Sequence, residues 1–181
     1  MSRTPAQEPD PGSESPVEML DACHDKIRQF TRLCLRLAAH LEEHGPDDQA
    51  VQAASRILRY FRLAAPLHHQ DEELDLFPAL LGLERPLIDA HQARTLRAQI
   101  GILESEHRQL EEIWRDIEPW LESIEKGQES ASPRGLKKFV DIYDAHIERE
   151  HSKVFPCVAF LPDWQRRQIC LRMAQRRGLT V

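Results

Sequence analysis

The sequence is poor in the residues that build sheets, disulfide frameworks and membrane spans. Glycine occurs only 7 times in 181 residues and aromatic residues make up 6%, a balance that favours helices over strands. The four cysteines form no CxxC pair, which is more typical of reduced thiols than of a disulfide framework. No apolar run is long enough to cross a bilayer, and the N-terminus has no hydrophobic signal core. We therefore expect a cytoplasmic, helical protein.

The sequence also lacks a block of one charge. Its formal net charge is −6, and acidic and basic residues are interleaved along the chain. Without a basic face, nucleic-acid binding has little support, and no membrane role is expected. The hydrophobic share of 41% and the length suit one soluble domain with a single core.

Three regions follow from the composition. Residues 1–15 are rich in proline, serine, glycine and acids, and cannot bury enough apolar surface to offset the entropy lost on ordering, so we predict a disordered tail. Residues 16–158 carry four long amphipathic segments, and residues 159–181 leave room for a short helix at about residues 163–177. Short connections between the segments predict an all-α, up-down-up-down four-helix bundle with a short extra C-terminal helix.

The ends of the first two helices can be predicted from capping residues. The first should span residues 16–44 and stop at Gly45, which is followed by proline. Asp47 or Asp48 should cap the second helix. Pro66 lies inside the second helix and should kink it just before its histidines.

The third and fourth helices are harder to delimit, because prolines interrupt or precede them. Pro86 obscures the start of the third helix within residues 84–94. We expect the third helix to overhang its neighbour or to end early near Pro119. Ser132 followed by Pro133 is typical of an N-cap with proline in the first helical position, so the fourth helix should begin there.

Polar residues in the apolar stripes of these helices are the informative feature. A histidine and a glutamate four residues apart lie one turn apart on the same helix face, so both can reach one centre. Such a pair alone is weak evidence, because about one match is expected by chance in a chain of this composition. The stripe residues that we nominate as metal ligands are His24, His68, Glu72, His107, His146 and Glu150.

Two of the histidine–glutamate pairs share a longer frame. The pattern H-x3-E-x4-F-P begins at His68 and again at His146, displaced by 78 residues. Each copy lies on the second helix of a helix pair, and the first helix of each pair has its own stripe histidine, His24 or His107. Such a repeat would place the ligands about a pseudo-twofold axis, which suits a centre of two metal ions.

The spacing from the first helix connection supports a common centre. His24 lies 21 residues before Gly45 and His68 lies 23 residues after it. At about 1.5 Å per residue, the two histidines reach nearly the same height in antiparallel helices.

Four imidazoles and two carboxylates are donors of intermediate hardness, suited to iron, manganese or zinc. Carboxylates can bridge ions about 3.5 Å apart, and two glutamates with a bridging hydroxide would offset most of the charge of two divalent ions. Ferritin-like carboxylate proteins instead combine E-x-x-H motifs with four glutamates, a combination that the six stripe residues, with only two glutamates, do not provide. These residues predict a two-ion site and leave the metal open.

The segments around His24, together with HHQDEELDLFP, ESEH and HIEREHSKVFP, resemble the hemerythrin-like (HHE cation-binding) domain over roughly residues 17–158. The resemblance implies a four-helix bundle with a non-haem, oxo- or hydroxo-bridged di-iron site that binds oxygen or related small molecules. By position, the six nominated residues match the family's ligands, with Glu72 and Glu150 as the bridges. Respiratory hemerythrins carry a further histidine four residues after the one that matches His107. Here that residue is Glu111, so one ligand is missing.

Three functions follow as hypotheses. The favoured one is binding or sensing of oxygen, nitric oxide or peroxide, as in a stress response. An enzyme is the second: a di-iron peroxidase, catalase-like scavenger or oxidase, for which Tyr143, one turn before His146, is a candidate redox partner, although a core role is more common. The third is iron storage or iron-dependent regulation through a protein partner that the sequence does not identify.

Several neighbours of the stripe have less defined roles. We expect five of them at the surface or in contact with the ligands, and any one of the five is also a candidate to replace a nominated ligand. They are His69, Glu73, Glu106, Glu111 and His151. His40, His44 and the C-terminal arginines are expected in solvent. Cys23 and Cys34 are expected to be small buried hydrophobic residues.

Overall fold

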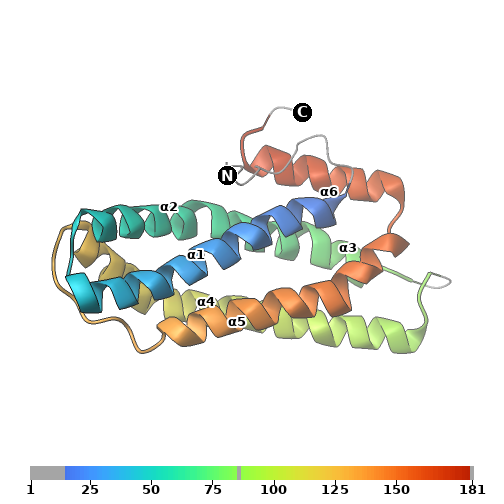
Figure 1. Ribbon diagram of the computed structural model, residues 1–181. Helices are drawn as coiled ribbons and strands as arrows, with labels where there is room; N and C mark the ends of the chain where they lie inside the picture. Colours follow the sequence, from blue (N-terminus) through green and yellow to red (C-terminus); the bar gives the residue numbers. More distant parts are fainter. Residues whose placement is uncertain (1–14, 85–86, 180–181) are drawn as a thin grey trace, which may run out of the picture. The chain divides into compact units, whose positions relative to one another are not determined.

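The computed structural model describes residues 15–84 and 87–179, and every regular element in these ranges is helical, which confirms the all-α class (Figure 1). The predicted disordered tail lies outside the described residues except for Ser15, and so does Pro86. In chain order the elements are α1 (Pro16–His44), α2 (Asp48–Asp71), η1 (Glu72–Leu76), α3 (Phe77–Leu81), α4 (Ala90–Glu125), α5 (Leu136–Arg149), η2 (Glu150–Val154), η3 (Phe155–Phe160) and α6 (Asp163–Arg176).

The connection between α1 and α2 confirms the predicted helix ends. Gly45 follows α1 with φ of 70°, a left-handed conformation that glycine adopts without steric cost. Asp47, rather than Asp48, caps α2, because its Oδ1 accepts a hydrogen bond of 2.8 Å from the Ala50 backbone N–H. His40 Nε2 lies 3.0 Å from the same carboxylate, so His40 is held at the helix connection and is not simply solvated as predicted.

The early end near Pro119, one of the two alternatives predicted for the third helix, is wrong, and so is the predicted start of the fourth helix. α4 continues through Pro119 to Glu125, because a proline removes one helical hydrogen bond and the turns on either side keep theirs. α5 begins at Leu136 and not at Ser132 and Pro133. Pro133 instead lies in a turn before the helix, and its carbonyl oxygen accepts a hydrogen bond of 3.1 Å from the Leu136 backbone N–H. α2 includes Pro66 and continues to Asp71, and the kink expected at Pro66 stays a prediction.

The chain divides into two compact units, and the helices α1, α2, α4 and α5 each contribute to both. The first unit comprises the described residues within 1–26, 67–105 and 147–181, and the second comprises residues 27–66 and 106–146. The second unit has an aromatic core. In it Phe61 of α2 packs against Trp114 of α4 and against Phe139 of α5, with ring centroids 5.0 and 5.2 Å apart.

The first unit is built around an aliphatic core that includes the C-terminal helix. α6 lies beside the first turns of α1 (Figure 1) and matches the short helix predicted at residues 163–177. It contributes Ile169 and Met173 to a core that also holds Met19 and Leu20 of α1. Phe77 and Phe155, from the two copies of the sequence repeat, are buried in the same core.

Both copies of the repeat contain a π-helical turn that the sequence analysis did not predict. The Phe77 backbone N–H donates to the carbonyl of Glu72, five residues earlier, and the Phe155 N–H donates to the carbonyl of Glu150. A proline follows each phenylalanine and has no N–H, so the next α-helical hydrogen bond is missing in any case. The helix can therefore widen by one residue at little further cost, and each wide turn begins at a nominated ligand.

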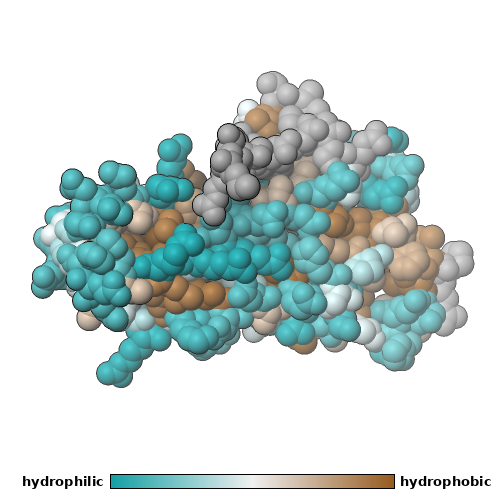
Figure 2. All heavy atoms as spheres, in the orientation of Figure 1, coloured by the Kyte–Doolittle hydropathy of each residue, from teal (hydrophilic) through white to brown (hydrophobic). Residues whose placement is uncertain are grey.

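The surface is polar on the face drawn in Figure 2, where hydrophilic side chains cover most of the area and apolar ones show between them. Within residues 15–84 and 87–179, no helix combines the length and the apolar character that crossing a membrane requires.

Candidate metal centre

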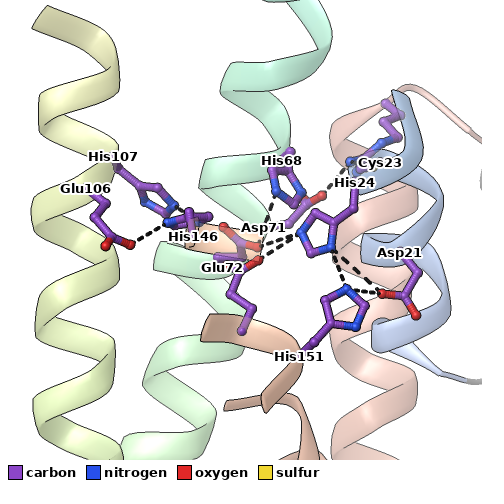
Figure 3. Close-up of polar contacts among 12 residues, drawn as sticks. Asp21, Cys23, His24, His68, Asp71, Glu72, Glu106, His107, His146 and His151 are labelled. Carbon is purple, nitrogen blue, oxygen red and sulfur yellow. Dashed lines mark hydrogen bonds and ion pairs between the residues drawn. The ribbon is translucent and has the colours of Figure 1, made fainter. Parts of the chain in front are cut away.

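Four of the six nominated ligands meet inside the first unit. They are His24 of α1, His68 of α2, Glu72 of η1 and Glu150 of η2, and all four are fully buried. His24 Nε2 lies 2.9 Å from Glu150 Oε2 and 4.0 Å from Glu72 Oε1. His68 Nε2 lies 3.4 Å from Glu72 Oε1. Figure 3 shows the His24 and His68 rings directed toward the Glu72 carboxylate.

These separations suit ligands of a common cation. Two atoms that each lie about 2.1 Å from one ion are about 3 to 3.5 Å apart, and the two shorter distances in the cluster are close to that range. One ligand atom from each of the four residues lies within 4.8 Å of all the others. Two imidazoles and two carboxylates are also the donor chemistry of iron, zinc and manganese sites. The residues of the first unit therefore fit a metal ion.

The charge balance of the cluster points the same way. The pKa of Glu72 is raised well above its usual 4.5, first by burial and then by the charge of Glu150 and a hydrogen bond with it. Two buried carboxylates side by side are costly unless a proton or a cation lies between them. A divalent cation would supply the missing positive charge without a proton.

Aromatic packing fixes the orientation of His24. Its ring stacks on Phe155 at a centroid distance of 5.6 Å and an interplanar angle of 3°, and it meets the edge of His68 at 4.9 Å. One ring nitrogen is thereby directed at the buried carboxylates and the other faces away from them. Phe155 is the residue of the repeat that closes the second π-turn, so the same motif supplies Glu150 and the support for His24.

The remaining two nominated ligands lie together in the second unit. His107 of α4 and His146 of α5 are buried, with their Nε2 atoms 3.1 Å apart. His146 Nδ1 lies 3.1 Å from Glu106 Oε2, whose side chain is 17% exposed. A carboxylate on the second nitrogen of a histidine orients the ring and strengthens it as a ligand. Glu106 therefore contacts a nominated ligand, as the sequence analysis expected of a supporting residue.

The other nominated neighbours separate into surface and supporting residues. Glu73 and Glu111 are exposed, as predicted for surface positions. His151 supports His24, because its Nε2 atom lies 3.2 Å from His24 Nδ1. Tyr143 is 3% exposed and packs edge-on against Phe139, which makes it part of the aromatic core of the second unit.

A group of ion pairs in the first unit escaped the sequence analysis. Arg176 and Arg177 at the end of α6 pair with the fully buried Asp71, and Arg176 Nη2 lies 2.6 Å from Asp75 Oδ2. Burial raises the pKa of Asp71, although both arginines act against that shift. The prediction that the C-terminal arginines are simply solvated is wrong for this pair. The local signal was the presence of two acids four residues apart, Asp71 at the end of α2 and Asp75 in η1, both of which are buried.

Comparisons with known proteins agree with this geometry. A protein of Haemophilus influenzae that is described only as uncharacterized is 38% identical to this chain over 136 residues, which are 75% of this chain and 74% of the relative. Residues 15–158 match the family described as the hemerythrin HHE cation binding domain, and this range contains all six nominated ligands. The chain therefore belongs to the hemerythrin HHE cation-binding family.

Proposed function

We propose that this protein holds a non-haem di-iron centre and uses it to bind or sense oxygen, nitric oxide or peroxide. The observation that carries the proposal is the set of four fully buried donors in the first unit, two imidazoles and two carboxylates. Burial and then the neighbouring Glu150 raise the pKa of Glu72. We further propose the up-down-up-down arrangement of four helices that the sequence predicts for this family.

We assign the ligands in two sets. His24 and His68 would hold one ion, His107 and His146 the second, and the two glutamates would bridge the ions. The repeat supports this division, because His146 lies one helical turn before Glu150 along the chain, as His68 lies one turn before Glu72. The 3.1 Å contact of Glu106 with His146 supports a ligand role for that ring.

Bound iron would supply a redox-active centre to which a small molecule can coordinate, and the chain determines what reaches it. The four donors of the first unit are fully buried, so only a ligand of a few atoms has access without unfolding. Phe155 covers one face of the His24 ring and keeps water from it. Burial therefore supports a diatomic molecule or peroxide over a larger substrate.

The test is anaerobic reconstitution of the metal-free protein with ferrous iron, followed by exposure to oxygen or nitric oxide. We expect two irons per chain and a change in the optical spectrum, and both should be lost in Glu150→Gln. The matched control is Glu148→Gln, an exposed residue on the preceding turn that should leave both unchanged. A wild-type protein that holds two irons and shows no optical change would refute the binding role.

The same preparation separates binding from catalysis. A single stoichiometric reaction with peroxide supports a binding or sensing module. Steady-state peroxide consumption that disappears in His68→Ala would instead assign the protein as an enzyme. Storage would require more iron per chain than the six ligands hold, so the metal content of the loaded protein tests that function as well.

A further inference from the structure

A second and smaller group of donors converges on the outer nitrogen of His24. His151 Nε2 of η2 lies 3.2 Å from His24 Nδ1 and 3.1 Å from Asp21 Oδ1 of α1, and Asp21 Oδ1 lies 3.8 Å from His24 Nδ1. All three residues belong to the first unit. Figure 3 shows Asp21 and His151 on the side of the His24 ring that faces away from His68 and Glu72.

The geometry of this group suits one cation. Its three separations are near the 3 to 3.5 Å expected for ligand atoms that each lie about 2.1 Å from one ion. Two imidazole nitrogens and a carboxylate oxygen are also ligands for the same metals as the buried cluster. The three ligand atoms lie within 4.8 Å of one another, as those of the buried cluster do.

The group differs from the buried cluster in its access to water. The side chains of His151 and Asp21 are 38% and 43% exposed, whereas His24 is buried. His24 therefore has one nitrogen toward solvent-accessible donors and the other toward the two buried carboxylates. His146 offers a comparison within the second unit, since its outer nitrogen meets a carboxylate that is only 17% exposed. One mostly buried carboxylate is therefore enough to orient a histidine ligand, and the exposed imidazole and carboxylate beside His24 exceed what orientation requires.

The shared imidazole couples the two groups of donors. A neutral histidine carries one proton, so either Nδ1 or Nε2 has a lone pair for a metal, but not both. An ion on the outer nitrogen therefore competes with an ion on the inner one. The outer group has three ligands only while the buried cluster does not use His24, and it is reduced to Asp21 and His151 once that cluster is filled.

We propose that Asp21, His24 and His151 form a solvent-facing capture site for ferrous iron, from which the ion passes to the buried ligands. The proposal rests on the metal-binding function proposed above. Transfer moves the ion from His24 Nδ1 to His24 Nε2, and the imidazole proton moves the opposite way, from Nε2 to Nδ1, by exchange with water. Phe155 supports both steps, because its ring stacks on His24 and lies 5.3 Å from the His151 ring, measured between centroids. It therefore holds the two imidazoles in place.

The test is the rate at which the full-length, metal-free protein takes up ferrous iron under anaerobic conditions, measured in a stopped-flow instrument by competition with a coloured chelator. At iron concentrations below saturation, Asp21→Asn and His151→Gln should each slow uptake on the order of 10-fold, because a negatively charged, preorganised outer site raises the local cation concentration. The final iron content should match the wild type. The controls are Asp25→Asn, an exposed acid on the next turn of α1, and His91→Gln, an exposed histidine on α4, and both should load at the wild-type rate.

Each outcome decides between the possibilities. Slow uptake to full iron content supports the capture site. Uptake at the wild-type rate overturns it while the buried centre stands, and slow uptake to a reduced iron content overturns it in favour of a positioning role for His151 and Asp21. A wild-type protein that takes up no iron removes the proposed function and this inference together.

A second measurement does not depend on the buried centre. In Glu150→Gln, cobalt(II) titration should still show one weakly bound ion at the outer site. That ion should be lost when His151→Gln is added and kept when His91→Gln is added. Loss of cobalt binding in Glu150→Gln alone, with the outer three residues intact, would contradict a separate capture site.

Discussion

Glu72 and Glu150 show at the scale of single residues how a binding site opposes the stability of the chain that contains it. Both carboxylates are fully buried, and the pKa of Glu72 is raised first by burial and then by the charge of Glu150. In the metal-free protein this pair stores unfavourable desolvation and repulsion, which a bound cation would relieve. Stability without metal and affinity for metal should therefore change in opposite directions when one carboxylate is removed.

Glu72→Gln should accordingly raise the free energy of unfolding of the metal-free protein by about 1 kcal/mol or more and weaken iron binding by at least about 100-fold. The gain depends on pH. Because the folded-state pKa of Glu72 is raised above 4.5, the cost in stability grows as pH rises from about 4.5 toward the raised folded-state pKa, is complete above that pKa, and is absent below about 4.5. The advantage of the variant should be present at pH 8 and fade toward pH 4.5 in urea unfolding. A metal-free variant less stable than the wild type at pH 8 would contradict this.

The cysteines differ in reactivity because they differ in burial. Cys34 is fully buried, which raises its pKa to about 12, whereas Cys157 is only partly buried. The thiolate is the reactive form, so iodoacetamide at pH 8 should modify Cys157 in the folded protein and Cys34 only after unfolding. Mass spectrometry of the digested protein measures both rates. Equal rates in the folded protein would show that the core around Cys34 opens readily.

At the scale of elements, hydrophobic periodicity predicts helices well and interruptions poorly. The period of 3.6 residues and the glycine at position 45 were enough to predict α1 and the start of α2. Pro119 and Pro133 were misleading, because a proline can be carried inside a long helix or used in a turn before one. The π-turns were missed because periodicity does not report a single extra residue. The recurring Phe-Pro after each ligand glutamate was the signal that could have indicated them.

The cap of α2 can be tested through pH. The pKa of Asp47 is lowered by the hydrogen bond from the Ala50 N–H and by the contact with His40. An acid with a lowered pKa stabilises the fold above its unfolded pKa of about 3.8, and that contribution is lost as pH falls through the folded value. Asp47→Ala should therefore unfold at a lower urea concentration than the wild type at pH 7, and the difference should vanish below the lowered pKa. A difference that persists at the lowest pH would assign the effect to packing.

The attachment of α6 can be tested by comparing two arginines. Arg176 pairs with the buried Asp71 and Asp75, whereas Arg62 of α2 pairs with the more exposed Glu118 and Glu122. Arg176→Met should lower the free energy of unfolding by about 3 kcal/mol, because it leaves buried carboxylates without part of their partner. Arg62→Met should cost less than about 1 kcal/mol. Equal effects in thermal or urea unfolding would show that burial does not set the value of these pairs.

At the scale of the whole molecule, the repeat in the sequence was the signal from which the six candidate ligands were nominated. The structure brings four of the nominated residues together in the first unit and the two remaining histidines together in the second, and the common centre of all six stays a prediction. The contacts of α6 with Asp71 and Asp75 were not predictable, since they join residues about 100 positions apart and no local pattern encodes such pairs. Asp21 was missed for a related reason, because its partner His151 lies far along the chain.

Metal binding should couple to folding across the whole chain. Ligands from three separate helical stretches of the first unit must be in place for the four donors to meet, so iron bound by the folded state alone should raise the unfolding temperature with iron concentration. Differential scanning calorimetry with and without iron measures the shift, and His68→Ala should abolish it. A shift of equal size in that variant would place the iron elsewhere.

The most direct test of the buried di-iron centre is X-ray absorption spectroscopy at the iron edge on the anaerobically reconstituted protein. We expect a shell of histidine nitrogen and carboxylate oxygen atoms and a second iron about 3.5 Å away, with both signals lost in Glu72→Gln. Iron surrounded by oxygen alone, without histidine scattering and unchanged in Glu72→Gln, would contradict the assignment of His24, His68, Glu72 and Glu150 as a metal site.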